Sequence, residues 1–282
     1  MTVKAFAKIN LYLDVLGKRA DGYHEIRTVM QTVNFYDRLS FRELKGEEVK
    51  VIYKGRYVPL KEGDSVKQAV ELLKKYGSLK RGIRVKVEKN IPVGAGLGGG
   101  SADAAATLKA LNLLWQLNLP LRELADLSGE LGSDVPSFIL GGTVYAEGRG
   151  ERVREMPALP RFWVIIVYPG FPIFTSEVYK EIGVKKLTTS PERIRILDRL
   201  GKVSEGGELK ECLYNKLEEV VLKKYPVLRQ VKKNLISQGA LGALLAGSGS
   251  AVFGILSNRE VGEEIKKFFK KYPYQVGVVQ SI

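Results

Sequence analysis

The chain opens with segments whose residues are β-prone or alternate between apolar and polar positions. These segments, at residues 5–16, 26–41, 49–53 and 83–88, are predicted to be strands. The Ala-Asp-Gly-Tyr sequence at residues 20–23 is typical of a turn between the first two. Val66, Val70 and Leu73 are spaced as on one side of a helix, which predicts a helix over residues 66–76.

The middle of the chain follows helical spacing. Apolar residues recur from Ala104 to Trp115, and the pattern stops near Asn118 and Pro120. Two further helices are predicted over 121–131 and 134–142, followed by a strand over 143–146. Pro157 and Pro160 then indicate a domain boundary, which divides the chain into domains 1–157 and 158–282.

The second half has the element order β-α-β-β-α-β. Its strands are predicted at residues 162–168, 242–246, 251–256 and 275–280. Helical segments are predicted over 191–238, with breaks at residues 206–207 and at Pro226, and over 260–271. This is the ferredoxin-like order.

The composition is that of an ordinary globular protein. The chain has 282 residues, 45% of them hydrophobic and 27% charged, with a net charge of +14. A strongly basic chain is typical of proteins that bind nucleic acids or multiply anionic substrates. The lysine pairs, however, are scattered and are not interleaved with aromatic residues, which favours solvated surfaces over a nucleic-acid site.

Few residues are available for thiol or metal chemistry. Cys212 is the single cysteine and His24 the single histidine, so the chain can form neither an internal disulfide nor a two-histidine metal site. No apolar stretch is long enough for a bilayer, and the N-terminus lacks the apolar core of a signal peptide. We therefore expect a cytoplasmic protein without a membrane partner.

The strongest chemical signal is a glycine-rich run between the strand over 83–88 and the helix that follows. Five glycines fall within seven residues, and Ser101 comes next. Glycine allows close approach to a ligand, and a helix start presents N–H groups and a positive dipole end, which together bind phosphate. The predicted binding residues are Pro92, Val93, Gly94, Ala95, Gly96, Leu97, Gly98, Gly99, Gly100 and Ser101. Ser101 is placed either at the helix cap or in its first turn.

Two commoner phosphate-binding motifs fit less well. Gly94, Gly96 and Gly99 match the spacing of a dinucleotide fingerprint, but no acidic residue follows at the required distance of about 20 residues. The P-loop needs a lysine after its last glycine, and Ser101 stands there instead. A flexible linker is disfavoured because the glycines lie between two well-patterned elements.

Four motifs in order resemble the superfamily of galactokinase, homoserine kinase, mevalonate kinase and phosphomevalonate kinase (GHMP). They are the glycine-rich run, the sequence at residues 245–253, the N-terminal residues 7–11 with 17–24, and the Gly-Ser-Asp-Val-Pro sequence at 132–136. The resemblance implies a two-domain α+β fold. The N-terminal nucleotide domain would be ribosomal protein S5 domain 2-like, and the C-terminal domain ferredoxin-like.

The N-terminal motif is the most selective of the four. It resembles the members that phosphorylate the 2-hydroxyl of a cytidine-diphosphate-linked methylerythritol in the non-mevalonate isoprenoid pathway. The resemblance therefore implies ATP as co-substrate, Mg²⁺ bound with it, and small-molecule partners rather than nucleic acid.

The same resemblance assigns roles to three polar residues. Asp134 would be the catalytic base, although an aspartate before Val-Pro also suits a helix cap. Lys8 would lie beside it and stabilise negative charge, whereas position alone would allow a lysine that reaches the surface. Asn10 has the same strand parity as Lys8 and would bind the substrate's hydroxyls, unless it is a strand-edge asparagine.

The remaining assignments concern the rest of the substrate. Tyr23 and His24 would contact the cytosine, with Tyr179 on its other face, although each could simply pack. Gly247, Ser248 and Gly249 would approach the phosphates, unless they only form a hairpin turn.

Overall fold

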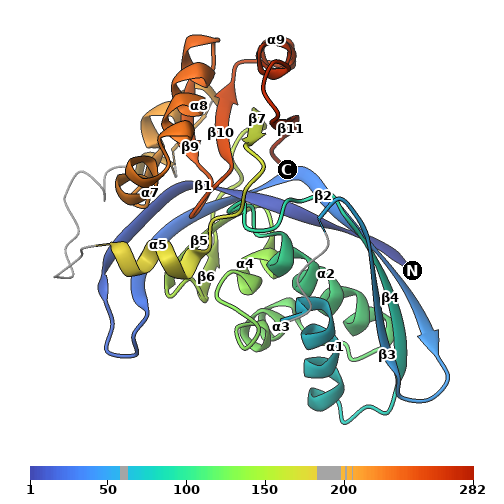
Figure 1. The fold of residues 1–282 in the computed structure, drawn as a ribbon. Coiled ribbons are helices and arrows are strands. Elements are labelled where there is room, and N and C mark those ends of the chain that lie inside the picture. Colours follow the sequence, from blue (N-terminus) through green and yellow to red (C-terminus); the bar gives the residue numbers. More distant parts are fainter. Residues whose placement is uncertain (58–62, 183–197, 201, 205) are drawn as a thin grey trace. The chain divides into compact units, whose positions relative to one another are not determined.

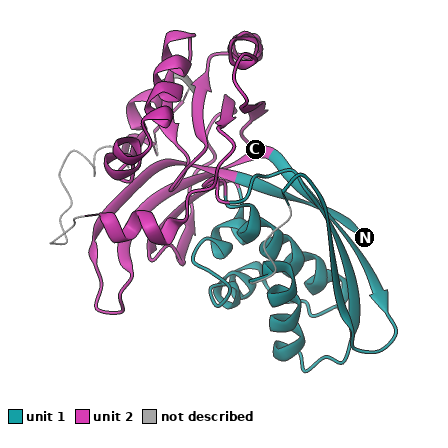
Figure 2. Cartoon of the chain, in the orientation of Figure 1, with its two compact units in different colours: residues 1–7, 35–93, 98–141 teal, residues 8–34, 94–97, 142–282 magenta. Residues whose placement is uncertain are grey.

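The structure is a computed structural model that describes residues 1–57, 63–182, 198–200, 202–204 and 206–282. Two compact units alternate along the sequence (Figure 2). Unit 1 comprises Met1–Ala7, Phe35–Val93 and Gly98–Gly141, and unit 2 comprises Lys8–Asn34, Gly94–Leu97 and Gly142–Ile282. The division of the sequence near residue 157 stays a prediction, because these units are defined by packing and not by chain order.

Two long strands contribute to both units. They are β1 (Thr2–Lys18) and β2 (His24–Leu44), which confirms the strand character of the first 45 residues. From Leu11 to Leu16 every residue of β1 is buried, polar Asp14 included. In a strand whose two faces are both buried, apolar and polar residues need not alternate, which explains the loose pattern in this part of the sequence.

Unit 1 contains a sheet with helices on one side (Figure 1). The end of β2 pairs antiparallel with β4 (Gly82–Lys89), which pairs parallel with β3 (Val49–Gly55). The helices are α1 (Ser65–Tyr76), α2 (Gly99–Leu114), α3 (Leu121–Ser128) and α4 (Val135–Leu140). All were predicted, although α3 ends three residues early in a turn in which the Leu131 N–H donates to the Ser128 carbonyl.

The core of unit 1 depends on small and branched side chains at helix crossings. Val66, Val70 and Leu73 are buried on α1, as their spacing predicts. The Asp64 carboxylate accepts the Lys67 N–H, which explains why α1 begins at Ser65. On α2 a run of alanines is buried, which lets neighbouring elements approach this helix closely.

Unit 2 holds the remaining part of the first sheet. Here β2 pairs antiparallel with β5 (Thr143–Gly148), β5 with β6 (Arg152–Glu155), and β1 parallel with β8 (Tyr214–Asn215). Neither β6 nor β8 was predicted. Strand β6 has four mostly exposed residues, and β8 has two residues within a stretch predicted to be helical. Neither therefore shows an alternation of apolar and polar residues from which a strand could be predicted.

The second sheet of unit 2 confirms the ferredoxin-like order. Its strands are β7 (Trp163–Tyr168), β9 (Gly242–Leu245), β10 (Val252–Leu256) and β11 (Gln275–Gln280). They lie in the order β11-β7-β10-β9, and every pairing is antiparallel. The sheet shares one apolar core with the helices of this unit and with Leu13, Val15 and Ile26 of the long strands.

The helices of unit 2 differ in part from the prediction. Beside β7 to β11 lie α5 (Thr175–Glu181), α7 (Glu218–Lys224), α8 (Pro226–Ser237) and α9 (Arg259–Phe269). The predicted break at Pro226 separates α7 from α8, but residues 206–212 form a 3-10 helix, η1 (Gly206–Cys212). Residues 191–197 of the predicted helical stretch lie outside the described residues. No described helix has the length and apolar character needed to cross a membrane.

Candidate active site

The residues predicted to form the site divide between the two units. Unit 1 contains Pro92, Val93, Gly98, Gly99, Gly100, Ser101 and Asp134. Unit 2 contains Lys8, Asn10, Tyr23, His24, Gly94, Ala95, Gly96, Leu97, Tyr179, Gly247, Ser248 and Gly249. The pairing of Asp134 with Lys8 therefore stays a prediction, and each part of the site has its own geometry.

In unit 2 the first half of the glycine-rich run is held by its carbonyl oxygens. Four consecutive carbonyls, those of residues 94–97, accept hydrogen bonds from the Ile173 N–H, the Ala251 N–H, the Lys8 Nζ and the Lys8 N–H, at 2.9 to 3.1 Å. A carbonyl oxygen cannot donate a hydrogen bond to an anion, so this segment can serve one only through its N–H groups.

Gly96 brings this segment against the loop between β9 and β10. Its φ is +77°, and a Cβ there would lie 1.8 Å from the Ala246 carbonyl oxygen. No other residue fits this position without moving the backbone. In the same loop, a Cβ on Gly247 would lie 3.2 Å from Lys8 Nζ and 3.0 Å from the Gly96 oxygen. The structure thus brings Lys8, Gly96 and Gly247 together.

A buried chain of hydrogen bonds orients Lys8 and Asn10. Lys8 is 5% exposed, so the interpretation of a lysine that reaches the surface is wrong. Its Nζ donates to Asn10 Oδ1 at 2.6 Å. Asn10 Nδ2 donates to Thr28 Oγ1 at 2.8 Å, and that hydroxyl donates to the Tyr12 carbonyl at 2.7 Å. Because the Thr28 hydroxyl donates its hydrogen to the Tyr12 carbonyl, it must act as the acceptor toward Asn10. The Asn10 amide nitrogen therefore faces Thr28, and its amide oxygen faces the Lys8 ammonium.

Two residues that support the β9–β10 loop were not found from the sequence. Asn215 Nδ2 donates to the carbonyls of Leu245 at 2.9 Å and Gly247 at 2.8 Å. Thr175, the first residue of α5, shares a hydrogen bond of 2.9 Å with the Ser248 hydroxyl. An isolated asparagine and an isolated threonine carry no pattern that could have marked them.

The aromatic residues expected at the cytosine form two separate contacts. The His24 and Tyr179 rings lie 5.1 Å apart between centroids, at 41°. Burial, together with the charge of Lys18, lowers the pKa of His24. At neutral pH the ring is therefore uncharged, with one donor and one acceptor nitrogen. Tyr23 is 55% exposed, and the Arg149 guanidinium lies 4.8 Å from its ring centroid.

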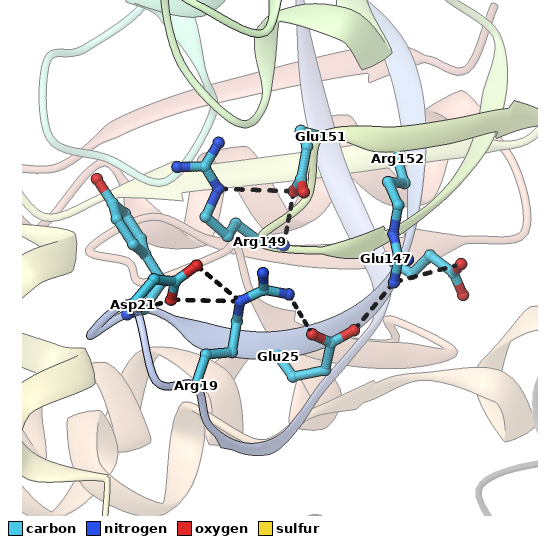
Figure 3. Close-up of polar contacts among 8 residues, drawn as sticks. Arg19, Asp21, Glu25, Glu147, Arg149, Glu151 and Arg152 are labelled. Atoms are coloured by element: carbon cyan, nitrogen blue, oxygen red, sulfur yellow. Dashed lines mark hydrogen bonds and ion pairs between the residues drawn. The ribbon is translucent and has the colours of Figure 1, made fainter.

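Ion pairs surround the β1–β2 turn that carries Tyr23 (Figure 3). The Arg19 guanidinium contacts Asp21 at 3.1 Å and Glu25 at 2.5 Å, and Glu25 also accepts from Arg152 of β6 at 3.2 Å. Asp21 in addition accepts the Tyr23 N–H at 3.1 Å. This hairpin network, defined by Arg19, Glu25 and Arg152, joins the turn to β6.

In unit 1 the second half of the glycine-rich run starts α2. Gly98 precedes the helix with φ +72°, a left-handed conformation that favours glycine, and its carbonyl accepts the first helical hydrogen bond from Ala102. Ser101 lies in the first turn, so of the two placements the cap is wrong. The first turn of a helix has N–H groups without helical acceptors, which suit an anion.

Asp134 directly precedes α4 but does not cap it with its side chain. It is half-buried, and Pro136 follows within the first turn. At the other end of α4, Lys109 of α2 donates to the carbonyls of Phe138 at 3.0 Å and Ile139 at 3.3 Å. A cation at a helix C-terminus is favourable, and here it joins the helix that follows the glycines to the helix that follows Asp134.

No group of three or more histidine, cysteine, aspartate or glutamate residues that could hold a metal occurs in the described part of the chain.

Family models match both halves of the chain. The model described as GHMP kinases N terminal domain matches residues 64–142, and the one described as GHMP kinases C terminal matches residues 198–275.

Similar proteins cover the whole chain. A 4-diphosphocytidyl-2-C-methyl-D-erythritol kinase of Pelotomaculum thermopropionicum is 40% identical over 100% of this chain and 98% of its own. The enzyme of that name from a Geobacillus species is 43% identical over 100% and 97%. A crystal structure of 4-(cytidine 5'-diphospho)-2C-methyl-D-erythritol kinase superposes with a TM-score of 0.83 at 30% identity, over 100% of this chain and 99% of that one. The mevalonate kinase of Methanococcus jannaschii shares the fold, with a TM-score of 0.76 at 18% identity over 100% and 98%.

Proposed function

Since the chain belongs to the 4-diphosphocytidyl-2-C-methyl-D-erythritol kinase family of GHMP kinases, we propose that it phosphorylates the 2-hydroxyl of 4-diphosphocytidyl-2-C-methyl-D-erythritol. ATP is the phosphoryl donor, and the products are the 2-phosphate and ADP. The reaction is a step of the non-mevalonate isoprenoid pathway. Full-length relatedness carries this proposal, and the buried Lys8 next to the glycine-rich run agrees with it.

The glycine-rich run binds the phosphates of ATP in this proposal. Its carbonyls at residues 94–97 are bonded within unit 2, and its N–H groups at the start of α2 lie in unit 1. Phosphoryl transfer depends mainly on positioning and on stabilisation of spread negative charge, which N–H groups and a helix dipole provide. Gly247, Ser248 and Gly249 lie beside the same segment and complete the phosphate site.

Asp134 and Lys8 carry out the proton and charge steps. Asp134 accepts the proton of the 2-hydroxyl as its oxygen forms a bond to the γ-phosphorus. The bond from that phosphorus to the bridging oxygen breaks, and ADP leaves. The Lys8 ammonium stabilises the developing negative charge, and Asn10 positions the hydroxyls of the acceptor. The fixed orientation of Lys8 and Asn10 supports these roles, because a group held in place needs no reorganisation during the reaction.

Tyr23, His24 and Tyr179 bind the cytidine. The exposed Tyr23 ring offers a face for stacking, worth about 1–3 kcal/mol per base. Neutral His24 supplies a donor and an acceptor to the edge of the base, and its lowered pKa supports this state. Mg²⁺ would enter with ATP and would be held chiefly by phosphate oxygens, whose negative charge it would partly neutralise.

Steady-state kinetics test the proposal. Purified protein should release ADP only when ATP and the cytidine-bearing alcohol are both present. The exchange Asp134→Asn should lower kcat by about 10²–10⁴-fold, the usual contribution of a general base, while the matched exchange Asp126→Asn at an exposed position should leave it unchanged. Equal turnover with mevalonate, homoserine or galactose would contradict the assigned substrate.

A further inference from the structure

A buried ion cluster lies beneath the start of α2. Lys89, the last residue of β4, is 2% exposed, and its Nζ donates to Asp37 of β2 and, at 2.7 Å, to Asp103 of α2. Both carboxylates are as deeply buried as the lysine. Three charged side chains from three elements of unit 1 are therefore in contact with one another and shielded from solvent, and they lie outside the set of residues proposed to bind or react with the substrates.

Asp37 holds the chain that leads into the glycine-rich run. Its Oδ2 accepts from Lys89, and its Oδ1 accepts the N–H groups of Asn90 at 2.5 Å and Ile91 at 2.8 Å. The next residue is Pro92, where the run begins. One carboxylate thus fixes three consecutive residues immediately before the phosphate-binding segment.

Lys89 links these residues to the far end of the run. Asp103 lies one turn into α2, and a Cβ on Gly99, the first residue of that helix, would lie 2.9 Å from the Ile91 Cγ2 and 3.3 Å from Lys89 Nζ. The two ends of the run are therefore in close contact, with the ammonium joining them. A shift of Asp103 away from Lys89 would move the first turn of α2 with it.

We propose that Lys89, Asp37 and Asp103 are positioning residues that hold the start of α2 against the end of β4. This aligns the N–H groups of residues 99–101 with the phosphates of ATP. The inference rests on the proposed function, because it assumes that the run binds ATP. The cluster acts through the backbone of the run and not on the reacting atoms.

The cluster is poorly suited to stability alone. Moving two carboxylates and an ammonium out of water is costly, and apolar side chains of similar volume often serve a core equally well. Asp103 Oδ1 also lacks a hydrogen-bond partner among the residues that the structure describes. What the charges add is direction, because charge-assisted hydrogen bonds from one ammonium hold two backbone segments at a fixed separation.

A matched pair of variants at Asp103 tests the proposal. Asp103→Leu keeps a similar shape but cannot accept the Lys89 hydrogen bond, whereas Asp103→Asn retains an acceptor oxygen. We expect Asp103→Leu to raise the KM for ATP about tenfold and Asp103→Asn to change it by less than about twofold, because small misalignments at such sites have large effects. The KM for the cytidine-bearing alcohol should stay constant in both, since a general loss of structure would change both constants.

The inference is overturned if Asp103→Leu leaves the KM for ATP unchanged, or if the KM values of both substrates rise in parallel. Should Asp103→Leu not fold, Lys89→Gln takes its place, since its shorter and uncharged amide cannot maintain both charged links. It must then raise the KM for ATP alone, and an unchanged value overturns the inference. Wild-type protein is assayed first. Absence of ATP-dependent turnover there would refute the proposed function and this inference together, whereas an active wild type with insensitive variants refutes the inference alone.

Discussion

Two ionic networks, one in each unit, differ in their access to water. The cluster of Lys89, Asp37 and Asp103 is buried in unit 1, where Lys89 is 2% exposed. In the hairpin network of unit 2, the side chains of Arg19, Glu25 and Arg152 are 33%, 22% and 59% exposed (Figure 3). The buried cluster contains two carboxylates and one ammonium, and the hairpin network contains two guanidinium groups and one carboxylate.

The comparison indicates that burial, and not contact distance alone, decides how much an ion pair contributes to stability. In water the attraction between exposed charges is weak and is offset by the side-chain entropy lost. In the protein interior each charge depends on its partner, because removal of one leaves the other buried and unpaired. The buried cluster should therefore tolerate substitution poorly, and the hairpin network should tolerate it well.

The largest effect is expected for removal of the central charge of the buried cluster. Lys89→Met leaves two unpaired carboxylates and should lower the free energy of unfolding by about 3–5 kcal/mol. Urea denaturation measures this, and Lys86→Met on the exposed side of β4 is the matched control. A loss no greater than that of the control would mean that burial does not distinguish the two networks.

The next effect concerns the pH dependence of stability. Burial raises the pKa of Asp103 from its ordinary 3.8 to about 7, against the lowering effect of Lys89. The folded state then binds a proton that the unfolded state releases near pH 4. The stabilisation of the folded state by this proton is complete below about pH 4 and is lost as the pH rises to about 7.

Asp103→Asn removes this proton. Between pH 4 and 7, the unfolding free energy of wild type should fall relative to the variant by at most about 1.4 kcal/mol per pH unit. Urea titrations at several pH values measure the difference. Parallel curves for the two proteins would show that Asp103 does not titrate in this range.

A smaller effect is expected in the hairpin network. Glu25→Gln removes the shared partner of Arg19 and Arg152, but both guanidinium groups remain hydrated. The midpoint of thermal unfolding should shift by less than about 2 °C. Differential scanning calorimetry is sufficient, and a shift as large as that of Lys89→Met would refute the contrast between the networks.

The smallest effect is that of salt on these differences. At 1 M salt the screening length is about 3 Å, so the residual difference between wild type and Glu25→Gln should vanish. The difference between wild type and Lys89→Met should persist, because ions do not reach the buried cluster. Denaturation at low and high salt compares the two, and equal salt sensitivity would contradict the assignment of burial.

Much of the fold could be predicted from local pattern. Helix α1 and strand β4 have clean apolar spacing, and the β-α-β-β-α-β order of the second half could be predicted from its strands and helices. Strands β6 and β8 could not be predicted, because they are short and are defined by their partners β5 and β1. The end of α3 was misplaced, since a turn with helical spacing can follow a helix without continuing it.

The candidate site shows the same division. The glycine-rich run, Lys8, Asn10 and Asp134 could be proposed because each lies in a short contiguous motif. Thr28, Asn215 and Lys89 act through partners distant in the chain and have no local signature. The sequence could propose two placements for Ser101 and two roles for Lys8, but only burial and helix geometry could decide between them.

By itself the sequence determined where the glycine-rich run stands, which elements flank it, and that the second half follows ferredoxin-like order. Periodicity and glycine content are properties of neighbouring residues, so they can be seen without a fold. Only the tertiary structure decided that Lys8 is buried against the Gly96 carbonyl and that Lys89 joins both ends of the glycine-rich run. These contacts link segments up to 88 residues apart, and their energies depend on the exclusion of water, which exists only once the chain has folded.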